Sequence, residues 1–331
     1  GIAEVAARAG VSKATASRAL SGAGYVSEKT RGRVRAAAEE LGYVPSAGAV
    51  SLATGRTQNI GVVMPYVNRW FFAEVLEGIQ QALLARGLDL TLYDAKPGTE
   101  GRDRIFDDFL ARKRFDGLIA VGLEPVNHEL ERLTRIGRPI VSIVGAGDQT
   151  SVVAVDDDYA ARRATEHLIG LGHVEILHVA GPQDWIEAES RMRGYLHALS
   201  DADLPTRPPI LGDWTADFGY RAAVELSRRL DFTAVFAGND AMAFGLLHGF
   251  RDVGVDLPHQ MSVVGFDDIP LARHAAPPLT TVHQHFAGLG ERAVRALLRA
   301  IGPAGPASAA ATDAAGGAGG AGEGIVDLTP E

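Results

Sequence analysis

The stretch Gly10–Leu20, GVSKATASRAL, decides how the start of this chain folds. Gly10 can adopt a positive φ and end one helix, and Ser12 can cap the next helix by accepting a hydrogen bond from a backbone N–H. Apolar residues recur at helical spacing on both sides of this turn. The stretch therefore predicts a helix-turn-helix, although an ordinary helix pair with a solvated face would share the pattern.

The helix that follows Ser12 carries side chains suited to DNA on its exposed side. Lysine, arginine, serine and threonine donate hydrogen bonds to phosphates and base edges. The exposed residues are Lys13, Thr15, Ser17 and Arg18, while Val11, Ala16 and Leu20 can pack inward. This division favours DNA binding.

The next segment predicts a third helix and supplies most of the positive charge. Ser27 can cap a helix over 28–41, whose apolar stripe is Val34, Ala38 and Leu41. Residues 1–56 hold eight Lys or Arg against four Asp or Glu, a net charge of +4. The whole chain carries −9, so the remaining residues carry −13. A basic three-helix head on an acidic body is typical of a DNA-binding protein.

Composition limits the possible classes of protein. The 331 residues suffice for two or three domains, and the absence of cysteine excludes disulfides and thiolate metal sites. The sequence predicts neither a metal nor another cofactor. No apolar run approaches the ~18–20 residues of a membrane span, and no hydrophobic secretion segment opens the chain, so we expect a cytoplasmic protein. The chain does not begin with Met, which is consistent with residues that precede Gly1.

A segment of small residues, 45–57, joins the head to the body. Pro45 ends the preceding helix, and the residues after it could form one or two helical turns that would be unstable alone. One interpretation is a flexible linker, which the composition favours. The other is a thin surface that approaches a minor groove and inserts Leu52 as an apolar wedge.

From residue 60 onward, apolar runs alternate with amphipathic helical segments. Apolar runs without polar alternation, separated by helices, indicate parallel sheets covered on both faces. The expected strands are 60–64, 88–93, 117–121, 140–144, 152–155, 176–180, 234–237 and 262–266. About ten such units exceed one ordinary sheet, so we expect two α/β lobes with a ligand in the cleft between them.

Polar residues that directly follow a strand are therefore the candidates for a ligand site. They are Asn68, Asp156, Asn239, Asp240, Asp267 and Asp268, and each could instead cap the following helix. Arg191 and Trp214 are more specific signals, because an arginine and an aspartate near an exposed indole form a recognisable set for polyol binding. A tryptophan in a loop can also be only a lid on the core.

The ordered motifs resemble the LacI/GalR family of bacterial transcription repressors over nearly the whole chain. In the head the matching residues are 4–6, 9–12, 15–20, 26–27, 29–31, 41–45 and Leu52. In the body they are 71–72, 166–168, 171–173, 180–182, 239–240, 262–268 and 277–282. The resemblance implies a small helical head with a helix-turn-helix, joined to a two-lobed α/β core with parallel sheets that is similar to periplasmic binding proteins.

The resemblance also implies roles for matching residues. Lys13 and Ala14 match the positions that read bases, and Leu52 matches an inserted leucine, which overrides the linker interpretation. The implied DNA-binding set is Ser12, Lys13, Ala14, Thr15, Ser17, Arg18, Thr30, Ala49 and Leu52. The implied ligand-binding set is Phe72, Asp156, Arg191, Trp214, Asn239, Asp267 and Gln284.

The expected domains are a head at 1–44, a hinge at 45–57 and a core at 58–301, divided into an N-lobe of 58–155 with 285–301 and a C-lobe of 156–284. Residues 302–324 form a low-complexity Ala/Gly/Pro tract, and 325–331 resemble the start of a truncated last strand. Two features depart from the family pattern. Ala14 is too small to hydrogen-bond to a base, and Gly48 weakens a hinge helix by ~1 kcal/mol relative to Ala.

The resulting hypothesis is a cytoplasmic, nucleoid-associated repressor that binds a palindromic operator as a homodimer and responds to a sugar-like effector. The sequence shows no leucine heptads of the kind that would predict a tetramer. The alternatives are a purine or nucleoside corepressor sensor of the same fold, and a sugar-binding protein without a DNA role. An enzyme is disfavoured, because the sequence contains no nucleophile motif or phosphate loop.

Overall fold

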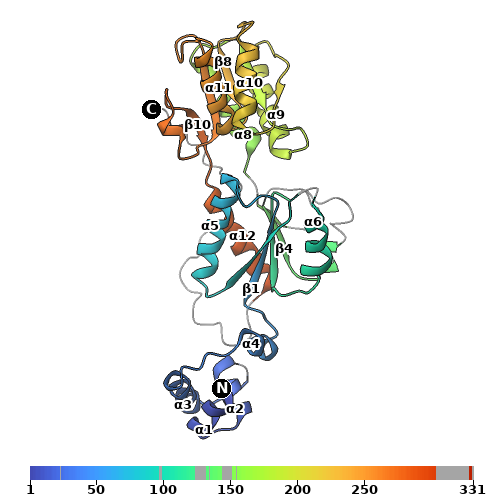
Figure 1. Cartoon of the computed structure of the whole chain (residues 1–331), viewed down its shortest axis with the longest axis vertical. Helices are drawn as coiled ribbons and strands as arrows, with labels where there is room; N and C mark the ends of the chain where they lie inside the picture. Colours follow the sequence, from blue (N-terminus) through green and yellow to red (C-terminus); the bar gives the residue numbers. More distant parts are fainter. Residues whose placement is uncertain are drawn as a thin grey trace. The chain divides into compact units, whose positions relative to one another are not determined.

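The computed structural model describes residues 1–22, 24–96, 99–123, 132–133, 135–143, 151–153, 155–302 and 328–329 (Figure 1). The described residues form two compact units. The first contains those of 1–154 and 286–318, and the second contains those of 155–285 and 319–331. Each unit is built around one predominantly parallel sheet, and the first also contains the helical head.

The head consists of α1 (Ile2–Ala9), α2 (Lys13–Ser21) and α3 (Glu28–Glu40). Gly10 ends α1 with φ 63° and Ser12 caps α2, so both predictions for the turn are confirmed. The small core of the head consists of Val5, Ala6, Ala9, Ala16, Ala19, Val34, Ala37 and Ala38. Leu41 was expected on the buried stripe but is 44% exposed, because α3 ends at Glu40.

The segment after the head forms the short helix α4 (Ala47–Thr54). The side chains of Ala49 and Leu52 lie outside what the structure describes, so their predicted DNA contacts remain expectations. The hydroxyl of Thr54 donates to Val50 O at 2.8 Å. Arg56 Nη2 donates to the carbonyls of Ile301 and Gly302 at 3.2 and 3.1 Å, which ties the segment after α4 to the end of α12 (Phe286–Ile301).

The sheet of the first unit has the order β2-β1-β3-β4-β5 and is parallel throughout. Its strands are β1 (Asn59–Met64), β2 (Asp89–Asp94), β3 (Gly117–Val121), β4 (Ile140–Ile143) and β5 (Ser151–Val153). Figure 1 shows α5 (Trp70–Leu84) and α12 on one face and α6 (Glu100–Arg104), continued by the π-helix η1 (Ile105–Phe109), on the other. Gly78 lets α5 and α12 touch, since a Cβ there would lie 2.0 Å from Ala287 O.

The sheet of the second unit has the order β11-β10-β9-β8-β6-β7. Its strands are β6 (Ile176–Ala180), β7 (Ile210–Leu211), β8 (Ala234–Ala237), β9 (Ser262–Asp267), β10 (Thr280–His283) and β11 (Leu328–Thr329). Only β11 runs antiparallel to its neighbour among the described strands. The helices pack in two pairs, α8 (Asp157–Gly170) with α9 (Ile186–Asp201) and α10 (Ala216–Leu226) with α11 (Asp240–Asp252), each pair joining a separate apolar cluster.

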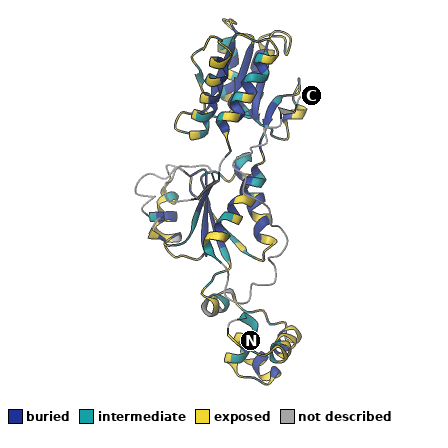
Figure 2. Cartoon of the chain, turned by 180° about the vertical axis from the view of Figure 1, so that it is seen from behind, coloured by how far each residue is buried: buried dark blue, intermediate teal, exposed yellow. Residues whose placement is uncertain are grey.

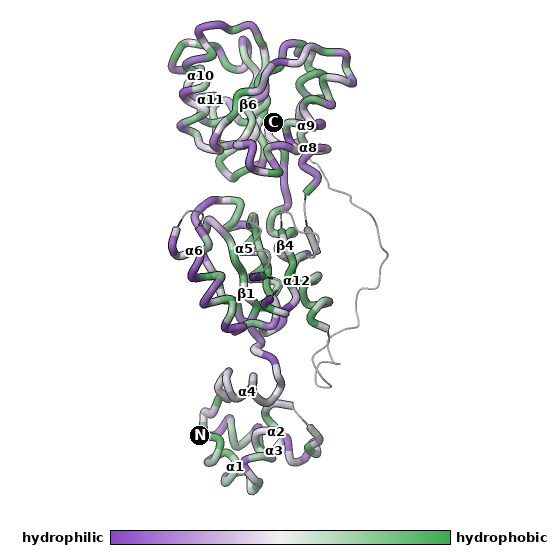
Figure 3. Tube along the Cα trace, turned by 90° about the vertical axis from the view of Figure 1, so that its right-hand side faces the viewer, coloured by the Kyte–Doolittle hydropathy of each residue, from purple (hydrophilic) through white to green (hydrophobic). Residues whose placement is uncertain are grey.

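Three central strands of the two sheets are buried along their whole length. Every residue of β3, β6 and β8 is buried, which is the continuous burial that apolar runs without alternation predict (Figure 2). Hydrophobic residues gather on the strands around β4 and β6, while hydrophilic ones occupy many of the surrounding turns (Figure 3). The predicted α/β class with parallel sheets is confirmed, and the predicted strands agree with the observed bounds within one residue at most ends.

Candidate DNA-binding face and polar ligand cluster

The start of α2 is held in place by its cap. Ser12 Oγ accepts a hydrogen bond from Thr15 N at 3.1 Å and lies 2.9 Å from Thr15 Oγ1. Lys13, Ala14 and Arg18 are exposed, whereas Thr15 and Ser17 are half-buried. A capped helix start with exposed cationic side chains is suited to lie against a DNA backbone or groove.

The start of α3 repeats this arrangement. Thr30 N donates to Ser27 Oγ at 3.4 Å, and the Ser27 hydroxyl donates to Thr30 Oγ1 at 2.9 Å. Thr30 therefore lies in the first turn of α3, where unpaired backbone N–H groups favour a phosphate.

Much of the positive charge of the head is not used internally. Arg8 pairs with Glu40 at 2.7 Å, and Arg31 lies 3.8 Å from Glu28. The cationic residues that make no ion pair within the described residues are Lys13, Arg18, Lys29, Arg33 and Arg35. These charges are available to replace counterions on phosphates.

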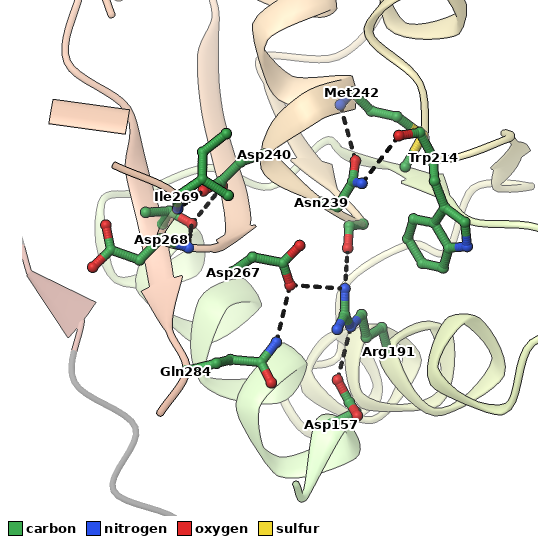
Figure 4. A network of polar contacts seen from close by, with 12 residues as sticks. Asp157, Arg191, Trp214, Asn239, Asp240, Met242, Asp267, Asp268, Ile269 and Gln284 are labelled. Carbon is green, nitrogen blue, oxygen red and sulfur yellow. Dashed lines mark hydrogen bonds and ion pairs between the residues drawn. The ribbon is translucent and has the colours of Figure 1, made fainter. Parts of the chain in front are cut away.

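A buried polar cluster around Arg191, on α9, is the second candidate site (Figure 4). Arg191 Nε donates to Asp157 Oδ1 at 2.8 Å, and Nη1 donates to Gly238 O at 2.6 Å. Arg191 Nη1 also lies 3.4 Å from Asp267 Oδ1. The guanidinium carbon is 3.9 Å from the centroid of the Phe266 ring. These contacts on several sides hold the guanidinium in one position.

Asp267 is the last residue of β9, and the turn that begins there directs its carboxyl group toward this guanidinium. Asp267 and Asp268 have φ of 114° and 55°, values that side-chain-bearing residues rarely adopt. Gln284 Nε2 donates to Asp267 Oδ1 at 3.0 Å, from the residue that follows β10. Figure 4 shows Arg191 and Gln284 converging on one oxygen of Asp267.

The carboxyl group of Asp240 stabilises this turn through two hydrogen bonds. Its Oδ2 accepts from Ile269 N at 2.8 Å, and its Oδ1 accepts from the Thr281 hydroxyl at 2.5 Å. Asp268 N donates to the same Thr281 hydroxyl at 3.3 Å. Asp240 is fully buried, so it supports the turn without reaching solvent.

Burial dominates the electrostatics of these carboxyls. It raises the pKa of Asp267 to about 7 despite the opposing charge of Arg191. Burial and the nearby charge of Asp267 raise the pKa of Asp240 to about 8. Burial also raises the pKa of Asp157, while the carboxylates of Asp157 and Asp267 raise that of Arg191 against its own desolvation. The cluster thus has more carboxyl groups than one cation can neutralise.

Trp214 had two interpretations, an exposed aromatic plate and a lid on the core, and its partial burial against an apolar cluster combines features of both. Its ring is partly buried against the backbone, since a Cβ on Gly181 would lie 2.1 Å from its Cζ2 and one on Gly238 3.2 Å from its Cζ3. Arg191 lies 5.5 Å from the ring centroid, and the ring of Trp185 stands edge-on at 6.3 Å. The residue therefore belongs to the cluster, with less free ring area than an exposed plate would have.

Of the other predicted ligand residues, Asn239 lies beside the Arg191 cluster, whereas Asp156 and Phe72 do not take part in its contacts. Asn239 caps α11 by accepting from Met242 N at 2.9 Å, and its Nδ2 donates to Trp214 O at 3.2 Å, so it lies beside the cluster and its predicted ligand contact stays a prediction. Asp156 is exposed and caps α8 by accepting from Tyr159 N at 3.0 Å, and it lies outside the Arg191 contacts. Phe72 belongs to the first unit, on α5, where its side chain is 1% exposed.

Sequence reasoning missed Asp157 and Thr281 and identified Asp240 only as a residue after a strand. Asp156, Asp157 and Asp158 follow one another, so nothing in the run shows which carboxyl turns toward Arg191. Only the structure distinguishes them, because Asp157 is buried in the first turn of α8 while its neighbours are more exposed.

The described part of the chain contains no group of three or more His, Asp or Glu residues arranged to hold a metal ion. None of its helices is both long and apolar enough to cross a membrane.

Comparisons with known proteins agree with this combination of a DNA-reading head and a ligand-binding α/β core. Residues 1–46 match the family model described as bacterial regulatory proteins, lacI family, and residues 165–313 match a periplasmic binding protein-like domain. The HTH-type transcriptional regulator CelR of Thermobifida fusca is 36% identical, covering 90% of each chain. A CelR–cellobiose complex is similar in structure, with a TM-score of 0.69, 33% identity and coverage of 91% of this chain and 93% of that one.

A lac repressor dimer bound to operator DNA and an anti-inducer gives a TM-score of 0.79 at 29% identity, covering 90% of this chain and 91% of that chain. A helical head joined to a two-lobed core of this kind defines a ligand-responsive transcription regulator. The chain belongs to the lacI family of bacterial regulatory proteins. Its relatives are regulators of transcription and not enzymes.

Proposed function

We propose that this regulator is a repressor that binds a palindromic operator as a homodimer, and that a sugar bound at the Arg191 cluster changes its affinity for DNA. The observation that carries the proposal is the presence in one chain of an exposed cationic helix, α2, and a buried polyol-type cluster of Arg191, Asp267 and Trp214. The operator-bound and cellobiose-bound relatives support it. The protein would act on DNA in the cytoplasm.

The mechanism we propose is a shift between two arrangements of the lobes. A ligand changes operator affinity only by the difference in its affinity for the two arrangements. Helix α4 lies between the head and β1, so a change in the first lobe reaches the DNA through it. In a dimer, two α2 helices would enter successive major grooves one helical turn apart.

The experiment that tests this function begins with DNA selected from random sequence by the purified full chain. The selected sites should be palindromic, and a panel of sugars and purines should then be screened for ligands that raise the melting temperature. A sugar that binds and also changes operator affinity supports the proposal. Asymmetric selected sites would contradict the dimeric operator, and a purine as the only effective ligand would contradict the sugar effector.

Leu52→Ala should reduce operator affinity by at least tenfold while effector affinity is unchanged. The reason is that the leucine is proposed to wedge between base pairs, and kinked DNA offers the protein more contact surface. Ser51→Ala on the same helix is the control and should have a small effect. Gel-shift titration measures the operator affinity. An unchanged affinity of Leu52→Ala for the operator would contradict the insertion of Leu52 between base pairs.

Effector binding should tighten about tenfold between pH 6 and pH 8. Hydroxyl groups of a sugar donate to a carboxylate, so binding favours the ionised form of Asp267, whose pKa in the free protein is raised to about 7. One unit below that pKa only about a tenth of the sites are ionised. Titration calorimetry in two buffers should show proton release on binding.

The nearby histidines provide the control for this pH profile. His283 Nδ1 lies 2.8 Å from Asp268 Oδ2, and His283 Nε2 lies 3.3 Å from His285 Nδ1. His285→Gln should keep the dependence if Asp267 causes it. A profile that is flat in the wild type, or that disappears in His285→Gln, would contradict the assignment to Asp267.

A further inference from the structure

The balance of charge in the Arg191 cluster limits the chemistry of the effector. Asp157 is buried and Asp267 nearly so, and Arg191 is the one cation that acts on either of them in the described part of the chain. Glu187 adds a further carboxylate whose charge acts on Arg191. A dianionic group placed here would meet more negative than positive charge in a region of low dielectric.

The lobe as a whole reinforces this balance. Residues 155–285 contain 19 Asp or Glu and 10 Arg, and no lysine follows Lys113 in the entire sequence. Lysine is a common phosphate-binding residue and acts as a compact mobile charge. The second unit therefore has no flexible ammonium group that could turn toward a phosphate.

The hydrogen-bond inventory points the same way. Arg191 uses Nε on Asp157 and Nη1 on Gly238 and Asp267, Gln284 uses Nε2 on Asp267, and Asn239 uses Nδ2 on Trp214 O. Most donors of the cluster are thus engaged, and the two without a partner among the described residues are Arg191 Nη2 and the buried Trp214 Nε1. A phosphate has only acceptor oxygens and needs several donors.

Acceptor atoms, in contrast, remain open to a ligand. Asp267 Oδ2 has no hydrogen-bond donor among the described residues, and Figure 4 shows this oxygen turned away from Arg191 and Gln284. Asp157 likewise uses only Oδ1 on Arg191. The hydroxyl groups of a polyol can donate to these carboxyl oxygens, and their own oxygens can accept from Arg191 Nη2. A polyol can therefore pair with the open acceptors and with this open donor of the cluster.

Arg191 is also prevented from turning outward to grip an anion. Its guanidinium is packed over the Phe266 ring and bonded to groups from three segments, at Asp157, Gly238 and Asp267. Turning it outward would leave the buried Asp157 without a cationic partner, which is costly.

We propose, on the basis of the proposed effector site, that this site selects an uncharged polyhydroxyl sugar and rejects phosphorylated and carboxylated sugars. The selection arises from an excess of buried carboxyl groups over a single guanidinium whose Nε and Nη1 are already engaged. The ligand binds by donating hydroxyl hydrogens to Asp267 and Asp157.

The test measures the affinity of the full chain, by titration calorimetry and thermal shift, for matched pairs of ligands. The pairs are ribose and ribose 5-phosphate, glucose and glucose 6-phosphate, and glucose and glucuronate, with cellobiose as a further neutral sugar. We expect a neutral sugar to bind and its charged partner to bind at least 100-fold more weakly. A charged sugar that binds as tightly as its neutral partner, or more tightly, would overturn the selection while leaving a sugar effector in place. If purines bind and no sugar does, the proposed function itself fails, and the selection with it.

A matched pair of variants tests the cause of the selection. Asp157→Asn removes a buried charge beside Arg191, so the discrimination between the neutral and charged members of a pair should narrow at least tenfold. Asp158→Asn changes the net charge equally on the next residue of α8, where the carboxylate is more exposed and pairs with Arg193, and should leave the ratio unchanged. Equal effects of the two variants would show that overall charge, and not the cluster, sets the selection.

Discussion

Arg191→Met abolishes effector binding and destabilises the second unit by about 3–5 kcal/mol, the cost expected when one partner of a buried ion pair is removed. Methionine fills similar space but leaves the buried Asp157 without its cationic partner, and Asp267 with only Gln284. Urea unfolding followed by circular dichroism measures the change in the free energy of unfolding. Titration calorimetry with a sugar identified in the screen measures the lost affinity.

Arg193→Met is the control for this variant, because it lies on the same helix with a half-exposed side chain. Arg193 pairs with Asp158 at the surface and makes no contact with the Arg191 cluster in the described residues. An exposed ion pair contributes at most about 1 kcal/mol, so this variant should fold and bind effector normally. If Arg191→Met retained effector binding, the cluster would not be the effector site.

Lys13→Glu reduces operator affinity at least 100-fold and lowers the salt dependence of binding, without changing effector affinity. Lys13 is exposed at the start of α2 and makes no ion pair within the described residues, so its charge is free for DNA. It also carries more of the predicted base reading, because its neighbour Ala14 has no hydrogen-bonding side chain. Gel-shift titrations over a range of salt concentrations measure the affinity and its slope.

Arg35→Glu is the control with the same change in net charge. Arg35 is exposed in the middle of α3, a helix that contributes only Thr30, in its first turn, to the predicted DNA-binding set. Its effect should be several-fold smaller than that of Lys13→Glu. If the two variants weakened binding equally, the contribution of Lys13 would be general electrostatic attraction and not a contact of α2 with the operator.

Much of the fold could be predicted from the sequence because local patterns carry it. Gly10 and Ser12 specify the turn of the head through backbone conformation and capping, which depend on neighbouring residues alone. The buried strands β3, β6 and β8 follow from runs of apolar residues. The strands β7 and β10 were not predicted, because short strands contain too little apolar pattern and depend on pairing with other strands of the sheet. The two residues of β11 lie within 325–331, which resembled the start of a last strand.

The polar cluster could be predicted only in part, because its contacts join residues far apart in the sequence. Asp267 and Arg191 were candidates from the sequence pattern and Gln284 from the resemblance, and the structure brings the three together. That Asp157 and not Asp156 faces Arg191 depends on the rotation of α8 against α9, which local sequence does not specify. The role of Asp240 depends on Thr281, 41 residues away on a neighbouring strand.

The sequence by itself determined the class of the protein, through a capped helix pair, an excess of positive charge in the head and alternating apolar runs in the body. These features depend on residues close together in the chain and on composition. Only the tertiary structure decided how the carboxyls share one guanidinium and how deeply Trp214 is buried, because the pKa of a group and its exposure depend on every element packed around it. The proposed preference for an uncharged sugar therefore follows from the packing of the second unit and not from any motif.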